Sequence, residues 1–546
     1  MSHPARTLIR NATLHTGTDL DQDGRAGALL TEGERIVWIG DTARTQAWGD
    51  GTDDVDEVLD VQGALVTPAF CDAHVHLTMT GQGLDGIDLS GTRSVGEVLR
   101  LIESAARHTR GRPIYAHSWD ETRWVERRAV TATELDRATY GGVVYMPRVD
   151  AHSASVSSAM AAVGRVHGLD GWDGHGVVTR EAFTAVTNAF TSGMTVQDRE
   201  HYLDLALRAA AETGLGLVHE TGAEHMTSFD DVQHVLDAGR RPGRTATVAY
   251  WGLRMDDPEQ AAELARHLGV LGLAGDLCAD GSFGSRTAHL REPYLDDDGR
   301  PTQERGYGYL SVPEIRDHVV ACTRAGLQAG GHVIGDAALD TMAEGFLAAS
   351  QIVGVAAIRA ARHRWEHVEL PSPEVLATMA DLGIWASMQP AFDAAWGGTE
   401  GMYAARLGEA RALAAVPLRD MVDAGVRVAL GSDSPVTPLD PWAGVRAALG
   451  HHNPDQRLTV AEAVAAHTRG GYALADREGG TLRVGGPATY VIWDDPGAGS
   501  GSGWTGPLTP DRLPALTGEP GEALPVCRRT VIDGHLAFDR EGATAP

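Results

Sequence analysis

The sequence predicts an α/β fold: a TIM-like (β/α)8 barrel with an insertion after its first strand, plus a small β-sandwich built from both termini. Two observations predict it. Between about residues 67 and 475, strand-like apolar runs alternate with helical stretches in eight units, the number that closes such a barrel. Outside this segment, both ends of the 546-residue chain show only short strand-like runs separated by turns.

The first predicted barrel strand follows the apolar run Ala64-Leu65-Val66 and ends at His74 and His76. Later strands are followed by helices such as Pro313 to Ala325 and Pro373 to Leu382. Each of these helices opens with a proline, which suits the first helical position because the missing N–H would be unpaired there anyway. The other seven strands are expected to end at Val218-His219, Ala249-Tyr250, Leu277-Cys278, Gly331-His332, Glu366-His367, Ser387-Met388 and Gly431-Ser432-Asp433.

The predicted domains divide the chain into a barrel and a composite sandwich. Residues 1–66 and 476–546 form the sandwich, and residues 67–475 form the barrel. Because a barrel of this kind typically needs only about 250 residues, part of the long middle segment must be an insertion. We place it at about residues 85–212, where helices are expected at Val95 to His108 and Thr133 to Thr139.

Composition excludes several functions. The formal charge is −28, from 46 basic and 74 acidic residues, which argues against nucleic acid or an anionic membrane as a partner. All 46 basic residues are arginine, so no Schiff-base lysine, phosphate-binding lysine or carbamylated lysine exists here. Four cysteines without a C-x-x-C pair, and no apolar run of about 18 residues, lead us to expect a soluble, cytoplasmic protein.

Histidine and aspartate side chains gather at the predicted strand ends. His74 and His76 are two residues apart, so on a strand their imidazoles point to the same side. His332, His367 and Asp433 end three later strands. Barrel enzymes place their chemistry at the C-terminal ends of the strands, and imidazole and carboxylate are ligands for a divalent metal. The five residues therefore predict a metal site at the barrel mouth.

These motifs resemble the amidohydrolase superfamily over nearly the whole length, most closely its amidohydrolase-3 branch, which includes N-substituted formamide deformylase-like enzymes. The resemblance rests on the segments Thr67 to His76, Ser118-Trp119-Asp120-Glu121, Arg148 to Ser153, Asp280 to Ala288, Gly331 to Asp336, Arg364 to His367, Gln389-Pro390, Gly431 to Pro435 and Leu458 to Ala463.

One departure from that branch affects the metal. Its members often carry a lysine four residues before the Asp-Gly-Ser motif, and where present that lysine can be carbamylated and bridge two metals. Here the position is Asp276. We expect one Zn²⁺ held by His74, His76, His332 and Asp433, with His367 beside it. In the alternative, Asp276 bridges two metals and His367 holds the second; its short side chain argues against this arrangement.

The resemblance implies hydrolysis of a carbon–nitrogen bond in a small amide or formamide through a metal-activated water. Asp433 would act as general base and then acid, and His367 would help to stabilise the tetrahedral oxygen. Alternatives are deamination of a small heterocycle or amine, and a metal-free binding protein without activity. Deaminases of the superfamily usually place a glutamate three residues after the strand-five histidine, where this chain has Gly335.

Further residues are expected around the substrate. By the resemblance, the side chains that contact it are Trp119, Asp120, Arg148, His152, Ser285 and Arg286. His219, at the predicted end of strand two, is equally compatible with a pocket-lining and a structural role. The expected partner is a small molecule, and a homodimer is expected from the resemblance alone.

Overall fold

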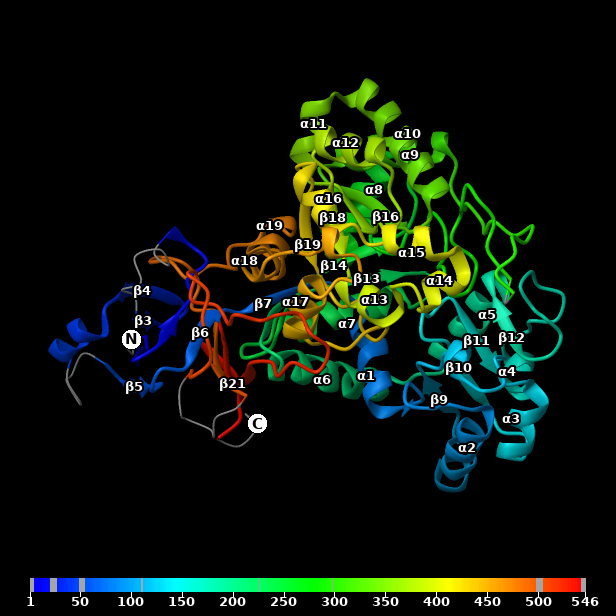
Figure 1. Cartoon of the computed structure of the whole chain (residues 1–546), viewed down its shortest axis with the longest axis horizontal. Coiled ribbons are helices and arrows are strands. Elements are labelled where there is room, and N and C mark those ends of the chain that lie inside the picture. Colours follow the sequence, from blue (N-terminus) through cyan, green and yellow to red (C-terminus); the bar gives the residue numbers. More distant parts are fainter. Residues whose placement is uncertain are drawn as a thin grey trace.

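The computed structural model describes residues 4–19, 27–48, 55–109, 111–224, 226–296, 298–496 and 504–541. The outermost residues of the predicted sandwich, 1–3 and 542–546, lie outside this range. A central barrel lies between the sheets of the two termini on one side and the insertion on the other (Figure 1).

Eight parallel strands form the barrel sheet, which confirms the predicted fold class. Its two edge strands meet through a parallel bridge between Val75 and Ser434, and the backbone N–H of Asp433 donates to the carbonyl of His74 at 2.8 Å. In order around the sheet the strands are β7 (Phe70–Val75), β13 (Leu215–Ala223), β14 (Ala246–Gly252), β15 (Gly272–Leu273), β16 (Gln328–Val333), β17 (Arg364–His367), β18 (Trp385–Met388) and β19 (Arg427–Leu430).

Helices surround this sheet and bury their apolar faces against it. The predicted proline-initiated helices are present: α9 (Val312–Ala325) and α12 (Pro373–Leu382), the latter ending at Gly383 in the left-handed region. The others are α1 (Leu77–Asp85), α6 (Val196–Glu212), α7 (Phe229–Gly239), α8 (Pro258–Leu268), α10 (Asp336–Val353), α11 (Val355–Ala361), α13 (Pro390–Trp396), α14 (Met402–Leu407), α15 (Glu409–Ala414), α16 (Leu418–Asp423), α17 (Pro441–Leu449), α18 (Val460–Ala465) and α19 (Gly471–Leu474).

Strand four is much shorter than the sequence predicts. The expected end was Leu277-Cys278, but β15 stops at Leu273, and Gly275 then adopts φ +72°. Cys278 rejoins the barrel through an isolated parallel bridge to His332. The intervening turn carries Asp276 to the end of the barrel where the strand-end histidines lie.

The chain termini build two sheets with a shared apolar core. One has the order β4-β3-β1-β5 and the other β2-β6-β20-β21-β22. Ile9, Leu29, Val66, Tyr490 and Ile492 belong to one buried cluster between them. Their bounds are β1 (Arg6–Arg10), β2 (Thr13–Leu14), β3 (Ala28–Glu32), β4 (Arg35–Gly40), β5 (Glu57–Asp60), β6 (Leu65–Pro68), β20 (Tyr490–Asp494), β21 (Val526–Ile532) and β22 (His535–Asp539).

The insertion has a five-stranded sheet of its own, which the sequence analysis did not predict. Its order is β12-β11-β10-β9-β8, and apolar clusters lie between the sheet and its helices. The elements are β8 (Ile87–Asp88), α2 (Val95–Thr109), β9 (Ile114–His117), α3 (Ala132–Thr139), β10 (Val144–Pro147), β11 (Ser153–Val156), α4 (Ser158–Val163), β12 (Val177–Thr179) and α5 (Arg180–Thr191).

Across the described ranges, no single helix is long and apolar enough to cross a bilayer. Helices α10 and α11 meet the length and composition test only when taken together, and they are bent by 114° at the break between them.

Candidate metal centre and active-site pocket

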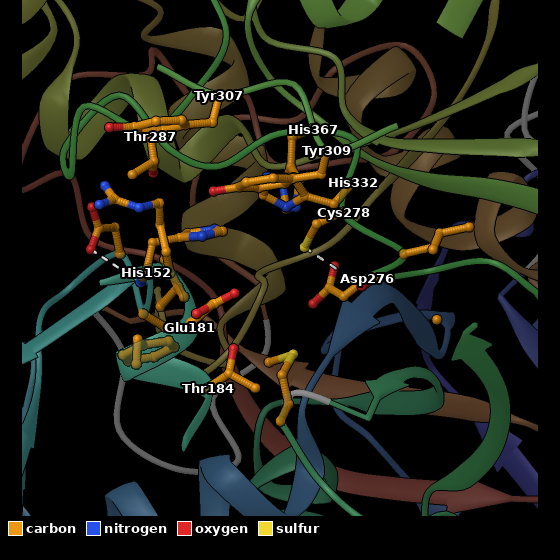
Figure 2. Close-up of a pocket in the computed structure, with 18 of the residues that line it drawn as sticks. His152, Glu181, Thr184, Asp276, Cys278, Thr287, Tyr307, Tyr309, His332 and His367 are labelled. Atoms are coloured by element: carbon orange, nitrogen blue, oxygen red, sulfur yellow. Dashed lines mark hydrogen bonds between the residues drawn. The ribbon is translucent and has the colours of Figure 1, made fainter. Parts of the chain in front are cut away.

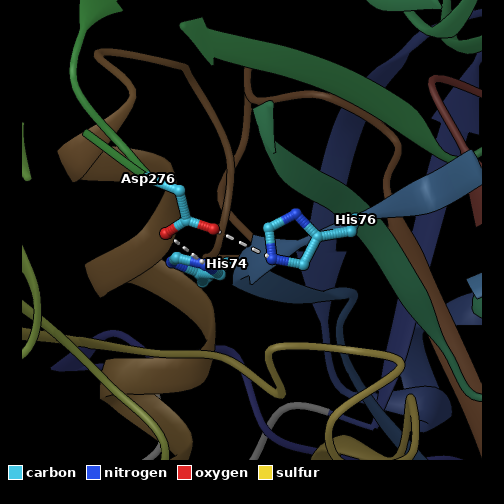
Figure 3. A group of neighbouring side chains, drawn as sticks. All are labelled: His74, His76 and Asp276. Carbon is cyan, nitrogen blue, oxygen red and sulfur yellow. Dashed lines mark ion pairs between the residues drawn. The ribbon is translucent and has the colours of Figure 1, made fainter. Parts of the chain in front are cut away.

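Six buried side chains converge at the C-terminal ends of the barrel strands. Five are the predicted ligands, and the sixth is Asp276. Figure 3 shows Asp276 facing both histidines of the first strand; its Oδ1 lies 3.5 Å from His74 Nε2 and its Oδ2 lies 3.2 Å from His76 Nε2. Asp433 Oδ1 is 3.4 Å from His74 Nε2 and 3.1 Å from His76 Nε2. Three overlapping groups have ligand atoms within 4.8 Å of one another: His74-His76-Asp276, His74-His367-Asp433 and Asp276-His332-His367.

The donor set fits a metal cation. His74 Nε2 and Asp276 Oδ1 are both buried without a hydrogen-bond partner, a costly state for polar atoms unless a cation is shared between them. Burial by itself lowers the pKa of His74, but the charges of Asp276 and Asp433 outweigh it and raise that pKa well above its usual value. The site therefore attracts positive charge strongly.

Beneath the cluster, a buried ion pair orients His74. Its Nδ1 donates to Glu366 Oε2 at 2.9 Å, so Nε2 is left to face the carboxylates. Arg364 holds Glu366 through two contacts of 2.5 and 2.8 Å and stacks over the ring of Tyr250. Although burial favours the neutral acid, the Arg364 guanidinium and His74 hold the pKa of Glu366 well below its usual range.

His367 and His332 are held by different contacts. His367 Nδ1 lies 2.8 Å from the side-chain oxygen of Gln389, and its backbone is left-handed with φ +72°. Asp433 is also left-handed, with φ +56°. Non-glycine residues in this region store strain of about 1–3 kcal/mol each, and such residues cluster at functional sites. His332 packs on the rings of His367 and His152, with centroids 4.6 and 4.9 Å away.

Asp276 reaches the cluster even though its side chain is short. The reason is the early end of β15, which lets the turn at Gly275 bring the backbone closer to the ligands. The histidines around it outweigh the effect of burial and hold the pKa of Asp276 well below its usual value.

His219 lies below the cluster. It is fully buried on β13, with Nδ1 3.0 Å from Arg364 and Nε2 3.5 Å from the sulfur of Cys71. Burial, followed by the charge of Arg364, lowers the pKa of His219 far below its usual value. The structural interpretation therefore describes this residue better than the pocket-lining one.

A cavity of about 870 Å³ opens from the cluster of six side chains toward the insertion. This is within the size range of small-molecule sites. His76, Asp276, His332, His367 and Asp433 line its inner end. Figure 2 shows further lining residues: the insertion contributes His152, Glu181 and Thr184, and the loop after β15 contributes Tyr307 and Tyr309.

Of the six residues predicted to bind substrate, His152 lines this cavity. Arg148 is instead buried among three carboxylates, at 3.3 Å from Asp120, 2.8 Å from Glu121 and 3.0 Å from Asp150. Ser285 donates to the same Asp150 at 2.8 Å. These contacts form a brace, here called the Arg148 brace, that joins the insertion to the loop after β15.

Two other residues that were predicted to bind substrate donate hydrogen bonds to backbone carbonyl groups. Trp119 is buried, and its indole N–H donates to the carbonyl of Met146 at 2.8 Å. Arg286 donates to the carbonyl of Leu295 at 3.2 Å. In the folded chain these five residues make the intramolecular contacts described above. That they also bind substrate stays a prediction for Trp119, Asp120, Arg148, Ser285 and Arg286.

Five further residues that line the cavity were not predicted from the sequence. Arg180, Glu181 and Phe183 come from the first turn of α5, and Tyr307 and Tyr309 from the loop between β15 and α9. The aromatic pair in Tyr307-Gly308-Tyr309 is a signal that could have suggested a binding loop. Nothing in the local pattern of α5 distinguishes its first turn from that of any amphipathic helix.

The sequence profile of the amidohydrolase family matches residues 57–537. N-substituted formamide deformylase of Arthrobacter pascens is 27% identical over 98% of this chain and 99% of that protein. The putative amidohydrolase YtcJ of Bacillus subtilis is 25% identical over 96% of this chain and 98% of its own.

Solved structures agree with the fold. An uncharacterized metal-dependent hydrolase from Pyrococcus furiosus superposes with a TM-score of 0.66 at 25% identity, over 90% of this chain and 99% of that one. A similar hydrolase from Pyrococcus horikoshii superposes with a TM-score of 0.68 at 22% identity, over 91% of this chain and 99% of that one, and supports the fold alone. The chain belongs to the amidohydrolase family, and it is a hydrolase that acts on carbon–nitrogen bonds.

Proposed function

We propose that this protein hydrolyses the C–N bond of a small amide or formamide, with one Zn²⁺ in the strand-end cluster and Asp433 as general base and acid. The observation that carries the proposal is the convergence of four imidazoles and two carboxylates at one end of the barrel, beside a cavity of about 870 Å³. The family, and the formamide deformylase among the relatives, support this reaction type.

His74, His76, Asp276 and Asp433 would hold the metal, because each carboxylate lies within 3.5 Å of both histidines. Asp276 takes the place expected from the sequence for His332, whose Nε2 instead lies 3.1 Å from the carbonyl oxygen of Gly281. His332 and His367 would lie beside the metal. The charge of the site supports one divalent ion. The two carboxylates carry two negative charges, and the four imidazoles bind a metal in their neutral form. One divalent ion would cancel the two negative charges, which is the most stable arrangement for a buried site. Imidazole and carboxylate ligands are typical of zinc.

A divalent ion bound here would lower the pKa of water to about 7 and polarise a carbonyl group. Asp433 lies at the edge of both the cluster and the cavity, where its carboxylate can accept the proton of the attacking water. The same carboxylate can then deliver that proton to the leaving nitrogen. His367 faces the cavity and its Nδ1 donates to the side-chain oxygen of Gln389, so the neutral ring presents the lone pair of Nε2, which would bind the metal. Only a protonated ring would donate to the carbonyl oxygen.

Deamination is the second candidate. It would require a proton shuttle near His332, and the residue three positions later, Gly335, has no side chain. The binding-protein alternative is opposed by the family membership and by the convergence of six metal-type ligand side chains. A cytoplasmic location and a homodimer stay predictions from the sequence.

A substrate screen with the metal-loaded protein tests the proposal. The library contains amides, formamides, lactams and amino-heterocycles, and the readouts are released amine, formate and ammonia. We expect amine release from amides or formamides, and its loss after chelation. Ammonia release from heterocycles alone would favour deamination, and no turnover in any class would favour the binding protein.

A further inference from the structure

Within the part of the chain that the structure describes, one carboxylate in the outer half of the cavity is not neutralised by any other side chain. Glu181 lines the cavity from the first turn of α5 and accepts only a long hydrogen bond, 3.4 Å, from the backbone N–H of Asp170. Figure 2 shows it reaching into the space across from Tyr309. Among the described residues, none forms an ion pair with Glu181.

The other charged groups of this outer half are already paired. Arg180 binds Asp170 through two contacts of 2.6 Å, and its guanidinium stacks 4.5 Å from the ring centre of Tyr307. Arg180 also adopts φ +48°, so this corner is held in a strained, defined conformation. Asp150 is neutralised within the Arg148 brace. Glu181 is therefore the group that gives the outer cavity its net negative charge.

Between Glu181 and the metal cluster, the walls are mostly apolar. The apolar and aromatic lining residues include Phe183, Met226, Leu277, Tyr309 and Val436. A ligand that reached from the cluster to Glu181 would pass through this apolar region. It would match the site best with an uncharged spacer and a positive charge at its far end.

We propose that the preferred substrates are cationic amides, in which an apolar spacer separates the scissile C–N bond from a protonated amine that binds Glu181. The inference rests on the proposed function. Tyr309 adds to the recognition of the cation, because an aromatic face attracts positive charge. The overall charge of −28 acts in the same direction by attracting cations to the cavity.

Three formamides of equal length test the charge preference with the metal-loaded enzyme: mono-N-formyl-1,6-diaminohexane, N-formyl-6-aminohexanol and N-formyl-6-aminohexanoate. We expect kcat/KM to fall in that order. Glu181→Gln should reduce kcat/KM for the ammonium compound about two- to fivefold, as expected for one exposed ion pair, and leave the alcohol unchanged. Glu181→Arg should reverse the order of the ammonium and carboxylate compounds.

Glu259→Gln is the matched control. Glu259 is an exposed carboxylate in the first turn of α8, as Glu181 is in α5, and it lies outside the cavity lining. It should change none of the three values. Similar hydrolysis of all three compounds by the native enzyme would overturn the inference and leave the proposed function standing.

If none of the three is hydrolysed, calorimetric binding of the same compounds decides. Tighter binding of the ammonium compound than of the alcohol, lost in Glu181→Gln and kept in Glu259→Gln, would support the inference while the proposed reaction fails. Equal or absent binding would overturn it. The two proposals can therefore fail separately.

Discussion

Glu366 accepts a hydrogen bond from Nδ1 of His74 at 2.9 Å, and this contact decides which nitrogen of His74 faces the metal cluster. A carboxylate can only accept here, so Nδ1 carries the proton and Nε2 offers a lone pair toward Asp276 and Asp433. Arg364 fixes the carboxylate from below. Glu366 is thus a positioning residue for a predicted metal ligand.

Glu366→Gln should lower metal affinity about 10- to 100-fold, because the amide releases the fixed orientation of His74 and leaves Arg364 without its counter-charge. Competition with a chromogenic chelator measures the affinity. Glu369→Gln is the control, since Glu369 is a buried carboxylate two residues beyond His367, close to the same strand end. Equal affinity in the native enzyme and Glu366→Gln would contradict this role.

Asp433→Asn should retain the fold and lose turnover by about 10²- to 10⁴-fold or more, because the amide cannot accept the proton of the attacking water. The measurement is kcat on the best amide from the screen, with thermal unfolding as the check on the fold. A rate close to that of the native enzyme would remove Asp433 from its assigned role.

Arg148→Met should destabilise the protein by about 3–5 kcal/mol, because Asp120 and Asp150 would lose their buried counter-charge and Glu121 would keep Arg406 alone of its two arginine partners. The thermal midpoint and KM should be measured together. Arg128→Met is the control within the insertion: it removes a more exposed pair with Glu134 and should cost at most about 1 kcal/mol. A raised KM with an unchanged midpoint would instead support substrate binding by Arg148.

Glu369 should make stability depend on pH. Burial raises the pKa of Glu369 to about 8, so the folded protein retains this proton at pH values where the unfolded chain has lost it. Its contribution to stability is therefore present below about pH 4.5 and is lost as pH rises toward 8, at up to about 1.4 kcal/mol per pH unit. Glu369→Gln does not titrate and should gain stability relative to the native protein over this range. If the native protein and Glu369→Gln gave parallel profiles of thermal midpoint against pH, the raised pKa of Glu369 would be contradicted.

The barrel and the convergence of the strand-end side chains could be predicted because local patterns determine them. Strand alternation places His74 and His76 on one side, and parallel strands bring their C-terminal ends to one face of the barrel. The place of Asp276 in the cluster required the early end of β15 and the turn at Gly275, which the apolar run around them does not reveal.

The outer cavity could not be predicted from local patterns. Glu181 and Tyr309 come from elements that lie far apart in the chain, and they meet only because the insertion folds on its own five-stranded sheet and packs over the barrel. The role of Arg148 could not be predicted from local patterns either. The resemblance to the family only suggested that this residue binds substrate. Only the packing of Asp120, Glu121 and Asp150 around it reveals its structural contacts.

Anomalous diffraction at the zinc absorption edge tests the central claim most directly. In crystals of the zinc-supplemented enzyme, we predict a single anomalous peak among the side chains of His74, His76, Asp276 and Asp433. A second peak within about 4 Å of the first would contradict the single-metal site. The absence of any peak at these residues would contradict the metal centre itself.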